Sequence, residues 1–275
     1  VDNKHMGPLI STVMTRCIHC TRCVRFATEV AGVPELGAIG RGETMEITTY
    51  LEKSLASELS ANVIDLCPVG ALTSRPYAFT ARPWELNKTE SIDVMDAVGS
   101  NVRVDARGAQ VMRVLPRLNE DVNEEWISDK TRYAIDGLRR QRLDRPYARG
   151  RDGKLQPISW DEALQTMAGK LRKAKANRVA AIAGNQCDAE SMFALKSLMA
   201  RLGSPHLDCR QDGAKIGGAR SGYLFNSTIA GIDDADALLI VGSNPRLEAA
   251  VLNARIRRNW LATQMPIGVI GQDAD

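Results

Sequence analysis

Cys17-Ile18-His19-Cys20-Thr21-Arg22-Cys23 is the stretch that decides the fold, together with the pair Cys67-Pro68. Three thiols at this spacing turn toward one centre only if the backbone coils into a tight loop, and a fourth thiol followed by proline closes the site. Cysteines in this pattern are typical of a 4Fe–4S cluster, whose irons are held by thiolates. Structural zinc sites more often use two separate C-x-x-C pairs, or a pair followed by histidines. The motif predicts one 4Fe–4S cluster on Cys17, Cys20, Cys23 and Cys67, with zinc or disulfides as the alternatives.

The same spacing has the form of a broken repeat. Bacterial ferredoxins with two clusters use C-x-x-C-x-x-C-x-x-x-C-P, in which the fourth cysteine binds the other cluster. Here Ala27 and Thr28 stand where the first run would have Cys-Pro, and Ser57, Ser60 and Val63 stand where the second run would have three ligands. The pattern therefore indicates a degenerate two-cluster ferredoxin-like module that keeps a single cluster.

The composition sets the broad class of the protein. The 275 residues are enough for about two domains with real cores, and the net charge of +3 is too small to indicate a nucleic-acid partner. No stretch has the roughly 18 consecutive apolar residues of a membrane span. Six cysteines, four of them in a ligand pattern, indicate a reducing compartment, and we expect Cys187 and Cys209 to be buried, inert thiols. Because the chain opens on Val1 and stops just past a predicted core strand, we expect it to be a fragment of a longer protein.

Three domains are predicted along the chain. Residues 1–90 form a small α+β iron–sulfur domain, with a helix over residues 52–63 that places Leu55, Leu59 and Val63 on one face. Residues 91–150 form a β-rich segment. Its stretches 101–105 and 110–114 alternate in polarity, and residues 106–109 between them are predicted to be a hairpin loop.

Residues 151–275 form the third domain, in which buried strands alternate with helices. Ser159 is an N-cap, and a second helix is expected over residues 189–202. Continuous apolar runs at residues 179–183, 237–241 and 266–270 predict parallel strands covered on both faces. This part is therefore predicted to be a doubly wound parallel α/β domain, incomplete at its C-terminus. No G-x-G-x-x-G follows its strands, so a dinucleotide site is only weakly supported.

Several stretches resemble the large iron–sulfur subunit of respiratory complex I. Among them are Met14-Thr15-Arg16-Cys17, Asp65-Leu66-Cys67-Pro68-Val69-Gly70-Ala71-Leu72-Thr73-Ser74 and Arg82-Pro83-Trp84-Glu85. The resemblance implies a subunit of NADH:quinone oxidoreductase that relays single electrons through its 4Fe–4S cluster toward quinone, with no independent substrate chemistry in this chain. In that family an N-terminal region, missing here, carries a 2Fe–2S cluster and a second 4Fe–4S cluster.

The resemblance also implies partners and a location. The partners would be other subunits of the hydrophilic arm, both the NADH- and flavin-binding ones and those on the quinone side. The chain would then be peripheral, on the cytoplasmic side of a bacterial inner membrane or on the mitochondrial matrix side. Neither a nucleic-acid partner nor a direct membrane span is expected.

The rest of the chain is similar to molybdopterin-dependent oxidoreductases such as formate dehydrogenase. The cluster ligands of that family would fall at Asp93, Asp96, Ser100 and Ser128, none of which is a cysteine. The catalytic metal ligand would fall near Gly213, with Cys209 as the nearest thiol. Because the cluster ligands of that family are replaced here, the α/β part is expected to be an inactive scaffold without molybdopterin. A molybdopterin-dependent oxidoreductase and a zinc-stabilised scaffold remain the alternative functions.

Overall fold

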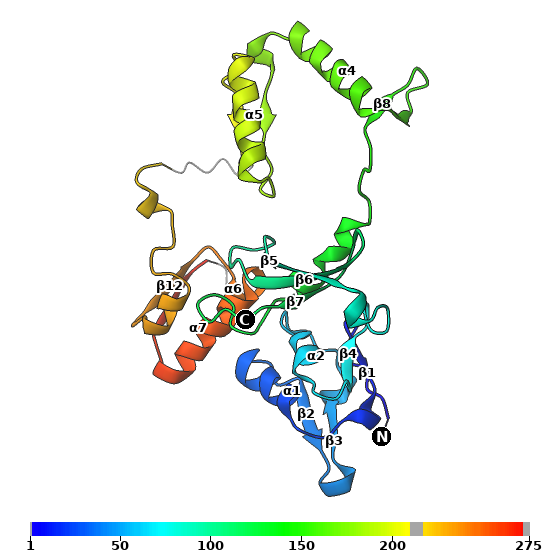
Figure 1. Cartoon of the computed structure of the whole chain (residues 1–275). Helices are drawn as coiled ribbons and strands as arrows, with labels where there is room; N and C mark the ends of the chain where they lie inside the picture. The colour runs from blue at the N-terminus through cyan, green and yellow to red at the C-terminus, as the bar shows by residue number, and fades with distance from the viewer. Residues whose placement is uncertain (1, 210–216, 272–275) are drawn as a thin grey trace. The chain divides into compact units, whose positions relative to one another are not determined.

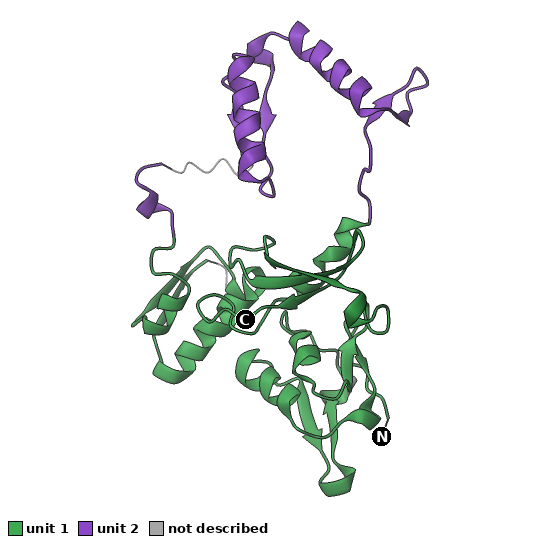
Figure 2. Ribbon diagram, in the orientation of Figure 1, with its two compact units in different colours: residues 1–139, 225–275 green, residues 140–224 purple. Residues whose placement is uncertain are grey.

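The computed structural model describes residues 2–209 and 217–271, and the chain forms two compact units. Unit 1 joins the residues up to Arg139 with those from Phe225 onward, and unit 2 consists of residues 140–224 (Figure 2). The predicted domains 1–90, 91–150 and 151–275 follow sequence motifs rather than packing, and this division stays a prediction. The packing adds one fact, which is that the residues after Phe225 belong to the same unit as the cysteine motif.

The cysteine motif lies in a part of unit 1 that we call the cysteine module, residues 6–74 (Figure 1). The module contains two antiparallel strand pairs and two short helices. Because β1 precedes the first three cysteines and β4 follows the fourth, the pairing of these strands brings both halves of the motif together. Its elements are β1 (Ile10–Thr12) paired with β4 (Leu72–Ser74), β2 (Leu36–Ile39) paired with β3 (Glu46–Thr49), α1 (Arg22–Arg25) continuing as the π-helical turn η2 (Phe26–Val30), and α2 (Asn62–Leu66).

The helix predicted over residues 52–63 is wrong, because the α-helix in this region begins only at Asn62. Side chains compete with helical bonding before that point. Ser57 Oγ accepts a hydrogen bond from the Leu59 amide at 3.2 Å, and the Glu35 carboxylate accepts one from the Ala56 amide at 2.9 Å. Leu59 is nevertheless buried, since its packing does not require a helix.

A three-stranded antiparallel sheet follows the cysteine module in the order β5-β6-β7. The predicted hairpin is confirmed, although residues 106 and 107 of its expected loop belong to β6. Gly108 in the turn has a φ of +59°, a left-handed conformation that glycine adopts without steric cost. One helical segment, α3 with η6, packs against β7. The bounds are β5 (Asn87–Ile92), β6 (Asn101–Arg107), β7 (Gln110–Pro116), α3 (Asp129–Tyr133) and η6 (Ala134–Leu138).

The last part of unit 1 is a parallel β-α-β arrangement, as predicted for this half of the chain. The prediction that its strands are covered on both faces is wrong, because Leu239, Val241, Val269 and Ile270 are exposed. Strand β12 (Leu238–Val241) pairs in parallel with β13 (Ile267–Ile270). Between them run the short helix α6 (Pro245–Glu248) and the longer helix α7 (Ala250–Thr263), which is absent from the elements predicted above.

Unit 2 contains a second parallel pair. Strand β10 (Ala181–Ile182) pairs with β11 (Leu207–Asp208), and α5 (Ala189–Arg201) runs between them. The single doubly wound sheet predicted for the second half is therefore represented, within the described residues, by two parallel pairs that belong to different compact units. The other elements of unit 2 are the hairpin β8 (Tyr147–Arg149) with β9 (Leu155–Pro157), and α4 (Trp160–Lys173), which Ser159 caps as predicted.

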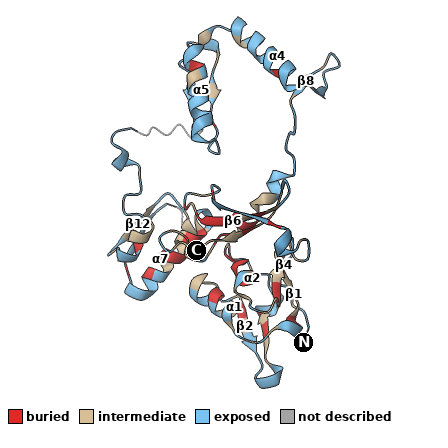
Figure 3. Ribbon diagram, in the orientation of Figure 1, coloured by how far each residue is buried: buried red, intermediate tan, exposed pale blue. Residues whose placement is uncertain are grey.

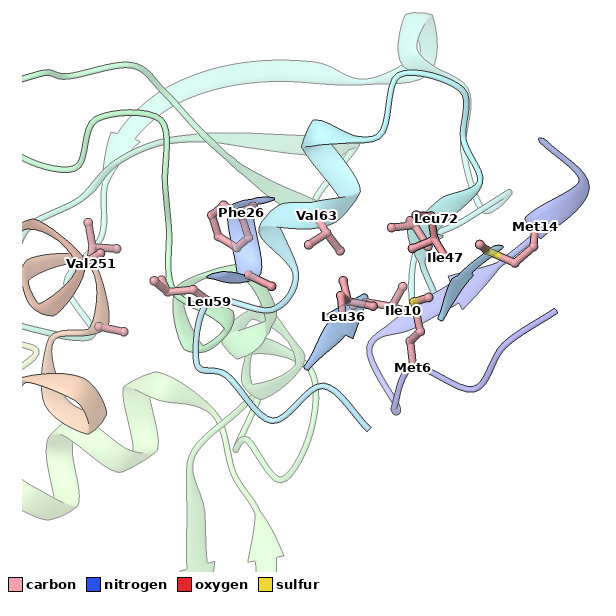
Figure 4. Packing of buried hydrophobic residues seen from close by; sticks show 13 residues of the cluster. Met6, Ile10, Met14, Phe26, Leu36, Ile47, Leu59, Val63, Leu72 and Val251 are labelled. Atoms are coloured by element: carbon pink, nitrogen blue, oxygen red, sulfur yellow. The ribbon is translucent and has the colours of Figure 1, made fainter. Parts of the chain in front are cut away.

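Helix α7 completes the main hydrophobic core of unit 1. Ala250, Val251 and Ala254 join residues of the cysteine module such as Phe26 and Leu59, and the core is drawn in Figure 4. Buried residues concentrate in unit 1, whereas much of unit 2 is exposed (Figure 3). None of the helices in the part of the chain that the structure describes is both long and apolar enough to cross a membrane.

Candidate iron–sulfur site

The first three cysteines sit on a loop that the backbone coils tightly. His19 and Thr21, the residues that flank Cys20, have φ angles of +54° and +59°, in the left-handed region that residues with a Cβ rarely adopt. Two left-handed residues around one cysteine turn the chain sharply back on itself. The tight loop predicted from the spacing is therefore present, and Cys23 already lies within α1.

The fourth cysteine directly follows α2. The Cys67 amide donates to the Val63 carbonyl at 3.1 Å, which is the last bond of the helical turn, and Pro68 then prevents the helix from continuing. The chain returns through Gly70, whose φ is +67°, into strand β4. The turn and the β1–β4 pairing place Cys67 opposite the loop of the other three cysteines.

All four cysteines line one hollow, which encloses about 390 Å³ including space open to solvent. Its walls are otherwise largely apolar and include Met14, Ile47 and Leu72. Cys17, Cys23 and Cys67 are half-buried, Cys20 is exposed, and all four are free thiols. The structure thus brings together every residue of the predicted site.

The hollow disfavours an isolated thiolate. The pKa of Cys23 is raised to about 11, mainly by burial, with a hydrogen bond from the Val24 amide opposing the rise and the nearby Cys17 and Cys20 adding to it. A bound metal centre would have to displace this proton, because metals bind the thiolate form of cysteine. The backbone also offers a donor to sulfur, since the His19 amide lies 3.4 Å from Cys17 Sγ.

The four thiols line one hollow without gathering around a single point. Among the described residues, no three His, Cys, Asp or Glu side chains are gathered closely enough to hold one metal ion. A 4Fe–4S cluster takes its thiolates on separate irons, so its ligands surround a larger body. Four cysteines spread around one apolar-walled hollow match that requirement.

The positions that would hold cluster ligands in molybdopterin-dependent relatives form a hydrogen-bonded set. Asp93 accepts from the Thr131 hydroxyl at 2.7 Å, and Ser128 Oγ lies 2.8 Å from that same hydroxyl. The Asp93 amide donates to the Ser100 carbonyl at 2.8 Å, and Asp96 forms an ion pair of 3.7 Å with a lysine of α3. These four residues lie near one another, and they are occupied by bonds to neighbouring protein groups.

Helix α2, which leads to Cys67, is held by a segment 65 or more positions further along the chain. The side chain of Asn62 is 1% exposed, and it pairs with the backbone of Ile127 through both of its polar atoms, donating at 2.8 Å and accepting at 3.2 Å. At the other end of α2, Arg132 donates to Asp65 at 2.5 Å. Sequence reasoning missed these residues, since no local spacing links them to the cysteines.

Asp129 belongs to the same segment and caps the start of α2. Its two carboxylate oxygens accept from the Ser60 hydroxyl at 2.6 Å and from the Ala61 amide at 2.8 Å. Burial raises the pKa of Asp129 to about 6, although both hydrogen bonds oppose the rise. An acid at the N-terminus of a helix is a recognisable signal only when the acid is close in sequence, and here it comes from a distant segment.

The remaining cysteines differ from expectation. Cys187 and Cys209 are both exposed, so the prediction of buried thiols is wrong. Cys187 lies in the turn after β10, and Cys209 directly follows the two-residue strand β11, positions that pack little apolar surface. Gly213, near which a molybdenum ligand would fall in the related enzymes, lies outside the described residues.

Three family models match consecutive parts of the chain. The first describes the ferredoxin-like domain of NADH-quinone oxidoreductase subunit 3 and covers residues 7–73. The second describes the 4Fe-4S domain of NADH-ubiquinone oxidoreductase NDSU1/NuoG-like proteins and covers residues 86–136. The third is the molybdopterin oxidoreductase family, which covers residues 142–275.

Whole-chain relatives carry names that agree with one another. The chain is 59% identical over its full length to the mitochondrial NADH-ubiquinone oxidoreductase 78 kDa subunit of Neurospora crassa, of which it covers 38%. It is 57% identical over its full length to the mitochondrial NADH dehydrogenase [ubiquinone] iron-sulfur protein 1 of Solanum tuberosum, of which it covers 37%. Over 98% of its length it is 55% identical to an NADH-quinone oxidoreductase subunit from Rickettsia conorii, of which it covers 40%. The chain thus spans about two fifths of the length of these relatives, and it belongs to the family of the large iron–sulfur subunit of NADH:quinone oxidoreductase.

Proposed function

We propose that this chain relays single electrons within an NADH:quinone oxidoreductase through one 4Fe–4S cluster held by Cys17, Cys20, Cys23 and Cys67. The observation that carries the proposal is the meeting of these four thiols at one hollow, in a chain that shares 55–59% identity with subunits named for that enzyme. A cluster bound there would accept and donate one electron at a time.

The residues around the hollow have three tasks in this proposal. The thiolates hold the irons, and the apolar walls at Met14, Ile47 and Leu72 limit the access of water. The His19 amide, directed at Cys17 Sγ, supplies a hydrogen bond of the kind that raises the potential of such centres. Hydrogen bonding and exclusion of water are therefore the means by which this chain would tune the cluster.

The wider setting forms part of the same proposal. Further 2Fe–2S and 4Fe–4S clusters would reside in other parts of the full-length subunit, and the partners would be the flavin-binding and quinone-side subunits of complex I. The subunit would be peripheral, on the cytoplasmic side of a bacterial membrane or on the matrix side in mitochondria. The α/β part, residues 151–275, would be a scaffold without molybdopterin, because Asp93, Asp96, Ser100 and Ser128 replace the cluster ligands of the related enzymes.

The first experiment is an anaerobic assay of iron and acid-labile sulfide, paired with EPR after reduction by dithionite. We expect about four irons and four sulfides per chain and a rhombic signal from the reduced cluster. Zinc without sulfide would leave only a structural site and would overturn electron relay. Eight irons would contradict the view that the second cluster has been lost.

A pair of cysteine variants tests the ligand assignment. Cys67→Ser removes the thiol that closes the hollow, so we expect iron and sulfide to fall well below four per chain and the EPR signal to change or vanish. Cys187→Ser is the matched control, because that thiol is exposed and lies in unit 2. Equal iron content in the two variants would show that Cys67 is not a ligand.

A further inference from the structure

A long groove in unit 1 takes no part in the site described above. It encloses about 1520 Å³, including open solvent, and one wall is made by residues 110–115 of β7. Neighbouring residues of a strand point to opposite faces of a sheet. A space that contacts six consecutive residues therefore runs along the edge of the strand and not over one face. The opposite wall comes from residues 73–80, which follow Cys67.

The edge of β7 beside this groove is unpaired. Among the described strands, β7 pairs only with β6, so its other edge presents backbone donors and acceptors. The strand has seven residues, or about 20 Å of edge. Such an edge is a template for one more strand, which an extended peptide supplies in many recognition modules.

Four arginines line the groove, Arg107, Arg113, Arg132 and Arg139, together with two carboxylates, Asp65 and Asp136. The first three arginines already pair with Glu85, Asp105 and Asp65. The Arg132 side chain is 5% exposed, yet its Nε has no hydrogen-bond partner among the described residues. No ion pair within those residues involves Arg139. Arg139 is exposed, so its guanidinium can pair with a carboxylate that enters the groove.

The groove also has an exposed aromatic wall. Phe79 is 86% exposed on a left-handed backbone with a φ of +67°. Beside it, the ring of Tyr77 is stacked under the Arg113 guanidinium at 4.9 Å from the ring centroid. Phe79 therefore offers apolar surface beside the groove.

We propose that an extended, acidic segment of another subunit of the same complex binds in this groove as an additional strand on the edge of β7. The backbone edge fits an extended conformation, Arg139 fits a carboxylate side chain, and Phe79 fits an apolar residue beside it. The inference rests on the proposed place of the chain in a multisubunit oxidoreductase.

The test uses the intact complex. The photoreactive residue p-benzoylphenylalanine is placed at Gln110 in the groove and, as the matched control, at Lys88 on β5, the opposite edge strand of the same sheet. After irradiation and digestion, mass spectrometry identifies the peptide joined to each position. We expect Gln110 to capture a peptide of another subunit that is rich in Asp and Glu, and Lys88 not to capture that peptide. Capture of this chain itself, of a basic or neutral peptide, or of no peptide overturns the proposal.

Charge variants in the same complex test how the segment is recognised. Arg139→Glu should lower the yield of the Gln110 adduct about fivefold, as expected for loss of one surface ion pair, and Arg139→Lys should largely keep it. Equal adduct yields from both variants would show that the positive charge of Arg139 does not contribute to binding of the segment. Copurification separates the two levels of inference. If the chain fails to copurify with other subunits of the oxidoreductase, the proposed function fails. If it copurifies without the expected adduct, only the groove proposal fails.

Discussion

Asp129 lies beside the start of α2 with its carboxylate bonded to Ser60 and Ala61, and burial raises its pKa to about 6 from an ordinary value of 3.8. The folded chain therefore binds this proton more tightly than the unfolded chain does. Its contribution to stability is fully present below about pH 4 and is lost as the pH rises through about 6. The difference of about two pKa units corresponds to about 3 kcal/mol.

Asp129→Asn tests this linkage. We expect the wild type to lose stability relative to the variant as the pH rises from about 4 to 6, because the variant has no proton to release there. Denaturant unfolding of the cluster-free chain at several pH values measures the difference. Asp121→Asn, an exposed position, is the control and should show no such trend. A pH-independent difference between Asp129→Asn and the wild type would contradict the assigned pKa.

Asn62 gives a second prediction at the scale of one side chain. Asn62→Ala leaves the buried Ile127 amide and carbonyl without partners, so we expect a loss of about 2–5 kcal/mol in the free energy of unfolding. Chemical denaturation measures the loss. Asn87→Ala, on the exposed strand β5, should cost little. Similar values for the two variants would mean that the Asn62 bonds do not hold α2.

Single residues show how far sequence reasoning reaches. The spacing of the cysteines predicted which thiols meet, because a coiled loop of seven residues leaves few alternatives. It did not predict Asn62 or Asp129, whose partners lie 65 and more positions away in the chain. A buried polar contact of this range has no local pattern, and only the packed structure reveals it.

The helical segment α1–η2 and helix α7 meet at Gly32, which has a φ of +74°. Arg257 of α7 donates to the carbonyls of Glu29 at 2.6 Å and Thr28 at 3.3 Å, at the end of the helical segment that begins beside Cys23. A Cβ at Gly32 would collide with the Arg257 guanidinium, in addition to the strain of the left-handed backbone. The left-handed backbone therefore favours glycine at position 32, and a side chain there would also displace Arg257.

Gly32→Ala should destabilise the chain by about 1–3 kcal/mol, through backbone strain and displacement of Arg257. Gly37→Ala is the matched control, because a Cβ there meets no atom within 4 Å and its φ is not positive. Thermal unfolding of both variants measures the contrast. Equal transition temperatures would mean that the contact between α7 and η2 does not contribute to the stability of the folded chain.

Elements were predicted well where periodicity and turn chemistry agreed. The hairpin β6–β7 and the Ser159 cap of α4 follow local rules, and the structure has them as expected. The helix over residues 52–63 failed because its leucines share a helical face while its serine and a distant glutamate bind the amides. The spacing of apolar residues indicates which side chains are buried, but burial of these side chains does not by itself make the backbone helical.

At the scale of the whole molecule, the core of the cysteine module includes residues from far along the chain. Residues 1–139 alone would leave the core positions of Ala250, Val251 and Ala254 empty. We expect this segment to be less stable by about 2–4 kcal/mol than the segment joined through a short linker to residues 225–271. Denaturation and binding of a hydrophobic dye measure the loss. Identical behaviour of both proteins would show that α7 is dispensable for the module.

The sequence could not assign α7 to this core, although parallel β-α-β pairing around it was predicted. The apolar residues of an amphipathic helix show that one face is covered, but they do not identify the covering element. The same reason explains why one continuous sheet was expected where the described residues contain two parallel pairs in different units.

The place of α7 in the core sets an order of events during synthesis. Cys67 is translated 183 residues before Ala250 (250 minus 67), so at about 5–20 residues per second the ribosome needs roughly 10–40 s to supply the missing side of the core. During that interval all four thiols exist on a nascent chain whose module is still open. Delivery of iron and sulfide is therefore expected to follow the emergence of α7, which makes cluster maturation a late step in the life of the new chain.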